Sequence, residues 1–168
     1  MKLVVAKRAL RQNEINCLVK ELWRLPHVGF INKRLWQTFK HIYVATHDGN
    51  FVGVCVVFPL KQWTKLGPLV ICQKYQGKGF GKALLTHVVQ NMDQRNLFIG
   101  SSNPKVCNIA EDLGFKKETS FFCVPSEIQR YLLSYIFTRF SFQYLLDAMK
   151  KKLRSGHWKY YYFLKRNQ

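Results

Sequence analysis

The sequence predicts one α/β (α+β) domain in which helices flank a mixed sheet. Three observations lead to this fold class: amphipathic helical patterns open the chain, an Asp-Gly turn separates two β-rich runs, and strands then alternate with helices. The chain has 168 residues, 48% of them hydrophobic, which is enough to bury a core without metals or disulfides. It contains neither an internal repeat nor a Ser/Gly/Pro-rich linker. We therefore expect a single domain over residues 1–168.

The first part of the chain is predicted to form two helices and then a β-hairpin. Apolar residues recur at helical spacing in residues 12–24 and again in residues 32–41, and Pro26 ends the first helix. Val, Phe and Tyr then dominate residues 42–46 and 51–59, which we interpret as two strands. The Asp-Gly pair between them is typical of a tight hairpin turn.

The remainder of the chain alternates strands with helices and then becomes rich in aromatic residues. We expect helices at residues 82–92 and 104–112, and strands at residues 66–72, 96–101, 115–124 and 157–165. Residues 125–156 are predicted to form a helical insertion before the last strand, as one helix or as two with a break near residues 138–142. The aromatic density of this insertion predicts either a homodimer contact or packing on the chain's own sheet.

The balance of charge is strongly basic. Lys and Arg number 27 against 9 Asp and Glu, which gives a net charge of +18 at pH 7. The basic residues run through the whole sequence, so a removable tail does not explain the excess. Because such a charge attracts polyanions and raises their encounter rate, we expect a nucleic acid or another acidic macromolecule as a partner.

The cysteines and the hydropathy pattern indicate a soluble protein of a reducing compartment. The five cysteines form no CxxC pair and no Cys/His cluster, so we expect neither a disulfide framework nor a metal site. The apolar run at the N-terminus is shorter than a secretion signal, and no apolar segment reaches membrane-spanning length. We therefore expect a cytoplasmic location and no membrane partner.

Residues 75–85, YQGKGFGKALL, place three glycines within five residues immediately before an apolar helical pattern. Glycines in this position let backbone N–H groups surround an anion, and the helix N-terminus adds its own unpaired amides. A nucleoside-triphosphate loop does not fit, because Gln76 replaces its first glycine and Ala83 replaces its final Ser or Thr. A dinucleotide GxGxxG motif does not fit either, because Lys82 replaces its last glycine.

What the residues do match is QxxGxG, as Gln76, Gly79 and Gly81, between a predicted buried strand and a helix. This pattern resembles the pyrophosphate-binding loop of the GNAT superfamily of acyl-CoA-dependent N-acyltransferases. The order of predicted elements is similar to that family over nearly the whole chain, and IAEDLGF at residues 109–115 looks like the end of its second cofactor helix. The resemblance implies a mostly antiparallel central sheet and acetyl-CoA as co-substrate.

Carried over position by position, the resemblance also implies which residues bind acetyl-CoA. The loop would hold the pyrophosphate through its amides, the preceding strand would pair with the pantetheine arm, and an asparagine past the next strand would touch the same arm. The implied residues are Val70, Ile71, Cys72, Gln76, Gly77, Lys78, Gly79, Phe80, Gly81, Lys82 and Asn103. A purely structural turn with solvated lysines, and a simple helix cap at Asn103, are the alternatives.

The sequence leaves the catalytic acid and base open. Many relatives carry a tyrosine four residues before the glycine of the Gly-Phe pair, where this chain has Ala110. Cys107, Tyr160 and Tyr162 are the candidates for the missing acid, and main-chain N–H near Ile71 could polarise the thioester carbonyl. None of the five histidines is singled out as a base.

On the acceptor side, the resemblance points to segments that are rich in basic and aromatic residues, which suit phosphates and bases. These residues are Trp23, Arg24, Lys33, Arg34, Trp36, Lys40, Trp63, Lys65 and Trp158. Buried tryptophans and solvated lysines on an amphipathic helix are the alternative for each of them. We therefore predict an N-acetyltransferase that moves an acetyl group from acetyl-CoA to a primary amine on a negatively charged macromolecule. Two alternatives remain: a catalytically silent, GNAT-like nucleic-acid-binding module, and an acetyltransferase for small-molecule amines.

Overall fold

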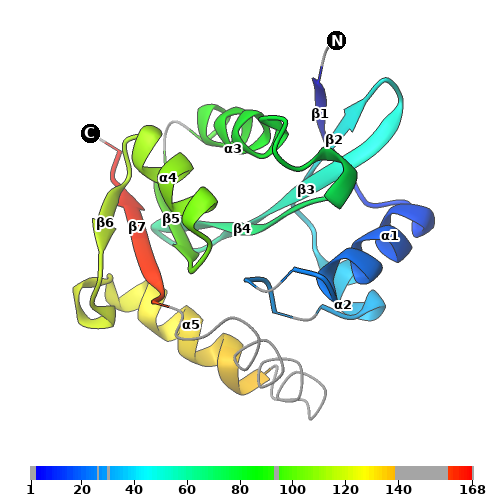
Figure 1. The fold of residues 1–168 in the computed structure, drawn as a ribbon. Helices are drawn as coiled ribbons and strands as arrows, with labels where there is room; N and C mark the ends of the chain where they lie inside the picture. Colours follow the sequence, from blue (N-terminus) through cyan, green and yellow to red (C-terminus); the bar gives the residue numbers. More distant parts are fainter. Residues whose placement is uncertain (1–2, 26, 30, 93–94, 139–158, 168) are drawn as a thin grey trace. The chain divides into compact units, whose positions relative to one another are not determined.

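The computed structural model describes residues 3–25, 27–29, 31–92, 95–138 and 159–167 (Figure 1). In chain order the elements are β1 (Leu3–Lys7), α1 (Gln12–Leu22), α2 (Lys33–Thr38), β2 (Ile42–His47), β3 (Asn50–Pro59), β4 (Trp63–Ile71), the short 3-10 helix η1 (Gln73–Tyr75), α3 (Phe80–Gln90), β5 (Asn96–Ser101), α4 (Pro104–Asp112), β6 (Lys116–Glu118), a second 3-10 helix η2 (Phe121–Cys123), α5 (Ser126–Thr138) and β7 (Tyr161–Lys165).

The chain divides into two compact units. Unit 1 comprises Met1–Leu25, Ile31–Phe58 and Leu66–Asp93, and unit 2 comprises Pro26–Phe30, Pro59–Lys65 and Gln94–Gln168. Strand β4 therefore begins in unit 2 and ends in unit 1. None of the helices in the described ranges is long and apolar enough to cross a lipid bilayer.

Unit 1 contains a sheet in the order β1-β2-β3-β4. Strands β2 and β3 form the predicted antiparallel hairpin, with Ile42 opposite Val56 and His47 opposite Asn50. Its turn places Asp48 at φ 48 and Gly49 at φ 75, the left-handed conformations that make Asp-Gly a preferred hairpin turn. The hairpin and its turn are thus confirmed.

Helices cover both faces of the unit 1 sheet. In Figure 1, α3 lies on one side of the sheet, and α1 and α2 lie together on the other. The apolar side chains of these helices and of the sheet form the core. Those exposed by 1% or less include Leu18, Leu22, Trp36, Val44, Val52, Leu84 and Val88. At 25 cal/mol per Å², roughly 1.5–3 kcal/mol per large side chain, this burial is the main term that stabilises the unit.

Unit 2 contains an antiparallel sheet in the order β5-β7-β6. Leu97 on β5 lies opposite Lys165 on β7, and Lys116 on β6 lies opposite Leu164. Trp63, Phe98, Val124, Ile128 and Leu164 form its buried cluster. The Glu127 carboxylate in the first turn of α5 accepts the main-chain N–H groups of Lys61 and Gln62, which ties this helix to the turn before β4.

The predicted bounds of β5 and α4 are confirmed to the residue, and other elements differ. Strand β1 was not predicted, and β4 begins at Trp63 rather than at residue 66. Helix α2 ends at Thr38 instead of His41, because Phe39 already has extended backbone at ψ 124.

The last predicted strands are shorter than expected. Strand β6 ends at Glu118 rather than at residue 124, because Ser120 caps η2 by accepting the Phe122 N–H at 3.2 Å. Strand β7 begins at Tyr161. Helix α5 confirms the start of the helical insertion, whereas residues 139–156, including most of the proposed break, lie outside the described residues.

Candidate functional site

The glycine loop follows β4 and leads directly into α3. Gly77 has φ 77 and Gly79 has φ 81, so both adopt the left-handed conformation that favours glycine. A Cβ at either position would meet no atom within 4 Å. The requirement for glycine is therefore conformational, since both residues have a positive φ that other residues rarely adopt.

The N-terminus of α3 opens onto this loop. Gly79 is the N-cap residue of the helix and supplies no side chain to cap it. The first intrahelical hydrogen bond described is that of Ala83 N to Gly79 O, at 3.0 Å. Because amides at the start of a helix precede the first intrahelical acceptor and carry the positive end of the helix dipole, this end of α3 suits an anion.

An aromatic cluster holds the loop against the hairpin. The Phe80 ring lies 4.9 Å from the His47 ring and 5.8 Å from the Tyr75 ring, measured between centroids. The ammonium groups of Lys74 and Lys78 lie 4.7 Å and 5.9 Å from the Tyr75 centroid. Two exposed cations are thereby placed beside the loop, where they add positive charge for an anion.

Two further motif positions contact Ile71, the last residue of β4. Gln76 Nε2 donates a hydrogen bond to the Ile71 oxygen at 2.8 Å, so this side chain closes the loop on itself. A Cβ at Gly81 would lie 3.5 Å from Ile71 Cγ1, which is an ordinary van der Waals contact. Gly81 thus tolerates alanine by its packing, in contrast to the conformationally constrained Gly77 and Gly79.

The end of β4 directs alternate residues to opposite edges. The Cys72 N–H donates to Val52 O on β3 at 2.9 Å, and a Cβ at Gly53 would lie only 2.2 Å from Val70 O. Val70 and Cys72 therefore direct their main-chain groups toward β3. Because consecutive residues alternate, Ile71 presents its main-chain N–H on the edge away from β3.

In unit 2, Asn103 serves as the N-cap of α4. Its Oδ1 accepts the Lys105 N–H at 3.0 Å, and its own N–H donates to Ser101 Oγ at 3.0 Å. Pro104 follows at the first helical position, where its missing N–H costs nothing. The structure thus shows the capping role that the sequence left open, and it leaves the side-chain NH₂ of Asn103 as the group suited to a ligand.

Cys107 and Ala110, the two positions on α4 that relate to a catalytic acid, are both buried. Cys107 is 5% exposed, its Sγ lies 3.9 Å from Ser101 O, and burial raises the pKa of its thiol. Ala110, where relatives carry tyrosine, is fully buried. A tyrosine ring at residue 110 would have to displace the packing around it, so α4 is built for a small residue there.

The two candidate tyrosines lie close together but in different environments. The rings of Tyr160 and Tyr162 are 5.4 Å apart, whereas Tyr161 stacks under Lys117 at 4.3 Å. Tyr162 is packed in parallel with Phe98, and burial raises the pKa of its phenol. Tyr160 is 43% exposed, so it is the more accessible of the two phenols.

His27 is a functional candidate that sequence reasoning did not single out. Its Nδ1 lies 3.3 Å from Ser102 Oγ, and burial lowers the pKa of its imidazole from the ordinary value of 6.5. The ring is therefore neutral at pH 7 and can accept a proton. No local pattern marks this residue, because the contact joins positions 75 apart in the sequence.

Some of the basic and aromatic residues expected on the acceptor side are buried, and others are exposed. Trp36 and Trp63 are 0% and 5% exposed and belong to the core, so for these two residues the alternative of buried tryptophans is confirmed over stacking on bases. Trp23 is 55% exposed, and the Arg24 guanidinium donates to Gln73 Oε1 at 3.1 Å. Trp158 lies outside the described residues.

Comparison of folds relates this chain to acetyltransferases. N-acetylglutamate synthase from Neisseria gonorrhoeae, complexed with coenzyme A and N-acetyl-glutamate, matches with a TM-score of 0.66 and 16% identity, over 98% of this chain but 35% of its own. The ribosomal-protein-S18-alanine N-acetyltransferase from Escherichia coli matches with a TM-score of 0.56 and 18% identity, over 69% of this chain and 80% of its own. A GNAT family acetyltransferase from Elizabethkingia anophelis with acetyl-CoA bound matches with a TM-score of 0.54 and 20% identity, over 71% and 82% of the two chains.

These likenesses confirm the predicted fold class, a mixed, mostly antiparallel sheet flanked by helices. No curated protein matches the sequence. This chain spans about a third of the gonococcal synthase chain. The model of the acetyltransferase (GNAT) family matches residues 11–115, from the start of α1 to the end of α4 and the Phe115 that follows it. Since this match covers more than half of the sequence, the chain belongs to the GNAT family of acetyltransferases.

Proposed function

We propose that this protein binds acetyl-CoA through the loop from Gln76 to Lys82 and transfers the acetyl group to a primary amine on a negatively charged macromolecule. The single observation that carries the proposal is the conformation of the loop. Gly77 and Gly79 turn the chain so that the dipole of an 11-residue helix ends at a loop containing exposed lysines. This arrangement suits a diphosphate, the group that joins the two halves of coenzyme A.

Membership of the family supports the choice of acetyl-CoA over other phosphorylated ligands. When bound, acetyl-CoA supplies a thioester carbonyl that an uncharged amine can attack. In unit 1, the Ile71 N–H on the edge of β4 away from β3 is the candidate donor to a developing oxyanion. Val70 O and the Cys72 N–H already face β3, and Ile71 O accepts a hydrogen bond from Gln76, which leaves the Ile71 N–H as the main-chain group of this segment suited to a ligand.

The candidates for the groups that move protons belong to unit 2. Alkyl amines have a pKa near ~10 and are mostly protonated at pH 7, so a neutral base is needed. His27 meets this requirement because burial lowers its pKa. For the proton that the departing thiolate requires, Tyr160 is the best of the three candidates, because Cys107 is buried and Tyr162 is packed against Phe98.

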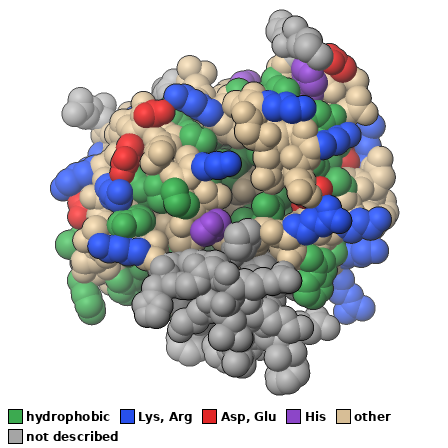
Figure 2. Space-filling view, viewed as in Figure 1, with side chains coloured by type: hydrophobic (Ala, Val, Ile, Leu, Met, Phe, Trp, Pro, Cys, Tyr) green, Lys and Arg blue, Asp and Glu red, His purple; other side chains and the backbone are tan. Residues whose placement is uncertain are grey.

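The charge of the chain supports a macromolecular, acidic acceptor. Lys and Arg side chains are scattered over the face shown in Figure 2, where Asp and Glu side chains are fewer. A net charge of +18 repels small cationic amines at long range and attracts nucleic acids or acidic protein complexes. The Escherichia coli neighbour, named for an alanine of a ribosomal protein, shows that this fold can serve a protein acceptor in that enzyme.

Calorimetric titration with acetyl-CoA tests the binding step. We expect micromolar binding that Gly79→Val weakens by roughly tenfold or more, about 1.4 kcal/mol, because a β-branched residue is strained at φ 81. Gly114→Val is the matched control, since Gly114 has φ 79 and equally open surroundings but lies at the end of α4. Absence of measurable binding by the wild type rejects the proposal.

Transfer of label from acetyl-CoA tests the acceptor. We expect acetylation of amine-bearing RNA or of an acidic protein complex, with a rate that falls as salt rises. Transfer to a polyamine alone, undiminished in high salt, would instead identify a small-molecule acetyltransferase.

A catalytically silent nucleic-acid-binding module is the second candidate function. It is favoured by the fully buried Ala110 at the position where relatives carry tyrosine. Steeply salt-dependent binding of RNA or DNA, without any transfer of label, would establish it.

Self-association is a further part of the proposal. Phe122 and Leu133 are 87% and 46% exposed, and large apolar side chains at a surface often mark a contact with another chain. We expect a homodimer in sedimentation experiments, weakened by Leu133→Glu. A monomer at high concentration would exclude it.

A further inference from the structure

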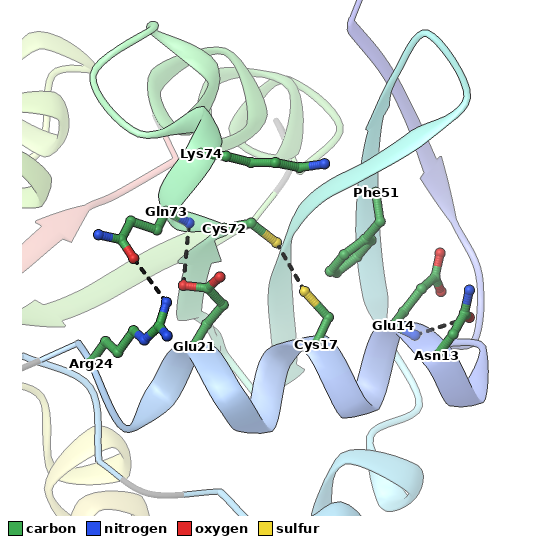
Figure 3. Close-up of a pocket in the computed structure, with 9 residues that line it drawn as sticks. All are labelled: Asn13, Glu14, Cys17, Glu21, Arg24, Phe51, Cys72, Gln73 and Lys74. Carbon is green, nitrogen blue, oxygen red and sulfur yellow. Dashed lines mark hydrogen bonds between the residues drawn. The ribbon is translucent and has the colours of Figure 1, made fainter.

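Three side chains with metal-binding chemistry converge in unit 1. Cys17 and Glu21 lie one turn apart on the same face of α1, and Cys72 follows the end of β4 (Figure 3). The two sulfur atoms are 3.5 Å apart. Both sulfurs and a carboxylate oxygen of Glu21 lie within 4.8 Å of one another. The sequence gives no hint of this cluster, since Cys17 and Cys72 are 55 positions apart.

The separation of the sulfurs decides between two kinds of site. Two thiolates on one tetrahedral metal, with bonds of ~2.3 Å, lie roughly 3.8 Å apart. A disulfide instead requires an S–S distance of ~2.05 Å. The observed 3.5 Å, at which the two thiols share a hydrogen bond, differs from the first value by a few tenths of an ångström and from the second by well over one. The hydrogen-bonded thiols therefore already lie close to the separation of a pair of metal ligands.

Neighbouring groups already orient two of the three ligands. Glu21 Oε2 accepts the Gln73 N–H at 3.2 Å, and Gln73 Oε1 in turn accepts a hydrogen bond from Arg24 at 3.1 Å. The Cys72 N–H is fixed to Val52 O at 2.9 Å. Such contacts behind the ligating atoms restrict their motion and are typical of built metal sites.

The cluster opens into a cavity of about 550 Å³, whose lining also includes Asn13, Phe51 and Lys74. Three protein ligands leave a fourth tetrahedral position, which faces this space and suits a water molecule or a small ligand. A divalent cation with two thiolates and one carboxylate carries a formal charge of −1, from +2 and three charges of −1. In a chain of net charge +18 this complex is electrostatically favourable.

We propose that Cys17, Glu21 and Cys72 bind a soft divalent cation of the zinc class, with a fourth position open to the cavity. The cation fixes α1 to the residue that precedes η1, and so stiffens the start of the glycine loop.

Titration of the reduced, chelator-treated full chain with Cd²⁺ tests this proposal without acetyl-CoA, so its outcome is independent of the proposed transferase activity. We expect an ultraviolet thiolate-to-metal charge-transfer band that saturates at one equivalent and that Zn²⁺ displaces. Cys17→Ser and Cys72→Ser abolish the band. Glu21→Gln, which keeps an oxygen acceptor for the Gln73 N–H, weakens Cd²⁺ binding by roughly tenfold or more.

Cys123→Ser is the matched control, because Cys123 is an exposed thiol outside the cluster, and it leaves the band unchanged. Cys17 and Glu21 are only half-buried, so their variants remain interpretable even if Cys72→Ser fails to fold. No band in the wild type, or a band that survives in Cys17→Ser, overturns the proposal. The proposal is also overturned if the reduced protein binds no Cd²⁺ and air oxidation joins Cys17 to Cys72 in a disulfide.

Discussion

Gln76 and Ile71 are joined by a hydrogen bond from the Gln76 side-chain amide to the Ile71 main-chain oxygen, 2.8 Å long. The contact spans the turn between β4 and the glycines, and thereby fixes how far the loop stands from the strand. In the family resemblance, Gln76 was assigned to the ligand. In this structure it shapes the loop that would receive the ligand, and these two roles have different experimental signatures.

Gln76→Ala is therefore expected to weaken acetyl-CoA binding by roughly fivefold, because it removes one hydrogen bond worth ~1 kcal/mol from the loop. Hydrogen exchange of the loop amides should accelerate in the same variant even without ligand. Gln90→Ala, at the exposed end of α3, provides the comparison. Unchanged exchange would show that Gln76 does not hold the loop.

Gly53→Ala should be strongly destabilising. A Cβ at this position would lie 2.2 Å from Val70 O and 2.9 Å from Ile71 Cα, so β3 and β4 must separate locally. We expect a loss of about 2–3 kcal/mol in the free energy of unfolding, measured by urea denaturation. Gly81→Ala is the contrasting variant, because its Cβ makes an ordinary 3.5 Å contact and alanine favours the helix.

The ion pair at the start of α1 should make stability depend on acid pH. Burial alone would raise the pKa of Glu14, but hydrogen bonds from Arg8 at 2.8 and 2.6 Å and from the Arg11 N–H at 2.8 Å outweigh burial, and the pKa is lowered. A lowered carboxyl pKa stabilises the fold above the unfolded value of 4.5, and this contribution is lost as pH falls through the folded pKa.

Glu14→Gln should accordingly lower stability at pH 7 by about 2 kcal/mol and flatten the decline below pH 4.5, as followed by thermal unfolding at several pH values. Glu118→Gln removes a more exposed carboxylate paired with Lys116 and should change the profile little. A wild-type curve that is already flat below pH 4.5 would contradict the assignment.

His27 should control the acid limb of the transfer reaction. Its pKa lies below 6.5, so the imidazole stays neutral at pH 7 and loses its function only in more acidic solution. His27→Gln is expected to lower kcat by roughly a hundredfold and to remove the acid limb of the pH profile. His87→Gln, on α3 beside Tyr43, should leave both unchanged.

Tyr160 and Tyr162 should differ in their contribution to kcat in the same assay. Tyr160→Phe removes the more exposed hydroxyl and is expected to lower kcat roughly tenfold with little change in stability. Tyr162→Phe should have little effect on kcat, since this ring is packed on Phe98. Equal activity of Tyr160→Phe and the wild type would leave solvent as the proton donor.

Local signals in the sequence account for the elements that were predicted well. The Asp48-Gly49 turn, the Pro104 start of α4 and the glycines before α3 each impose a backbone conformation that few other residues allow. Strand β1 was missed because it lies at an edge, where Val4 is 54% exposed, so its apolar run shows no alternation. Its existence depends on pairing with β2.

The parts of the site that sequence reasoning could not provide all depend on long-range contacts. Nothing near His27 in the sequence indicates Ser102, and nothing near Cys17 indicates Cys72. The same holds for burial: Trp36 and Trp23 have similar basic neighbours in the sequence, yet one is in the core and the other is on the surface. Loop chemistry is encoded locally, whereas the partners of single side chains are set by the fold.

Because Gly100 on β5 has no side chain, there is room beside it for the ring of Tyr160. A Cβ at position 100 would lie 2.5 Å from the Tyr160 hydroxyl oxygen. The two positions are therefore expected to evolve as a pair. A lineage that acquires alanine at position 100 must also move the ring of Tyr160 or replace it by a smaller residue. Among homologous sequences, glycine at the first position should accordingly co-occur with an aromatic residue at the second.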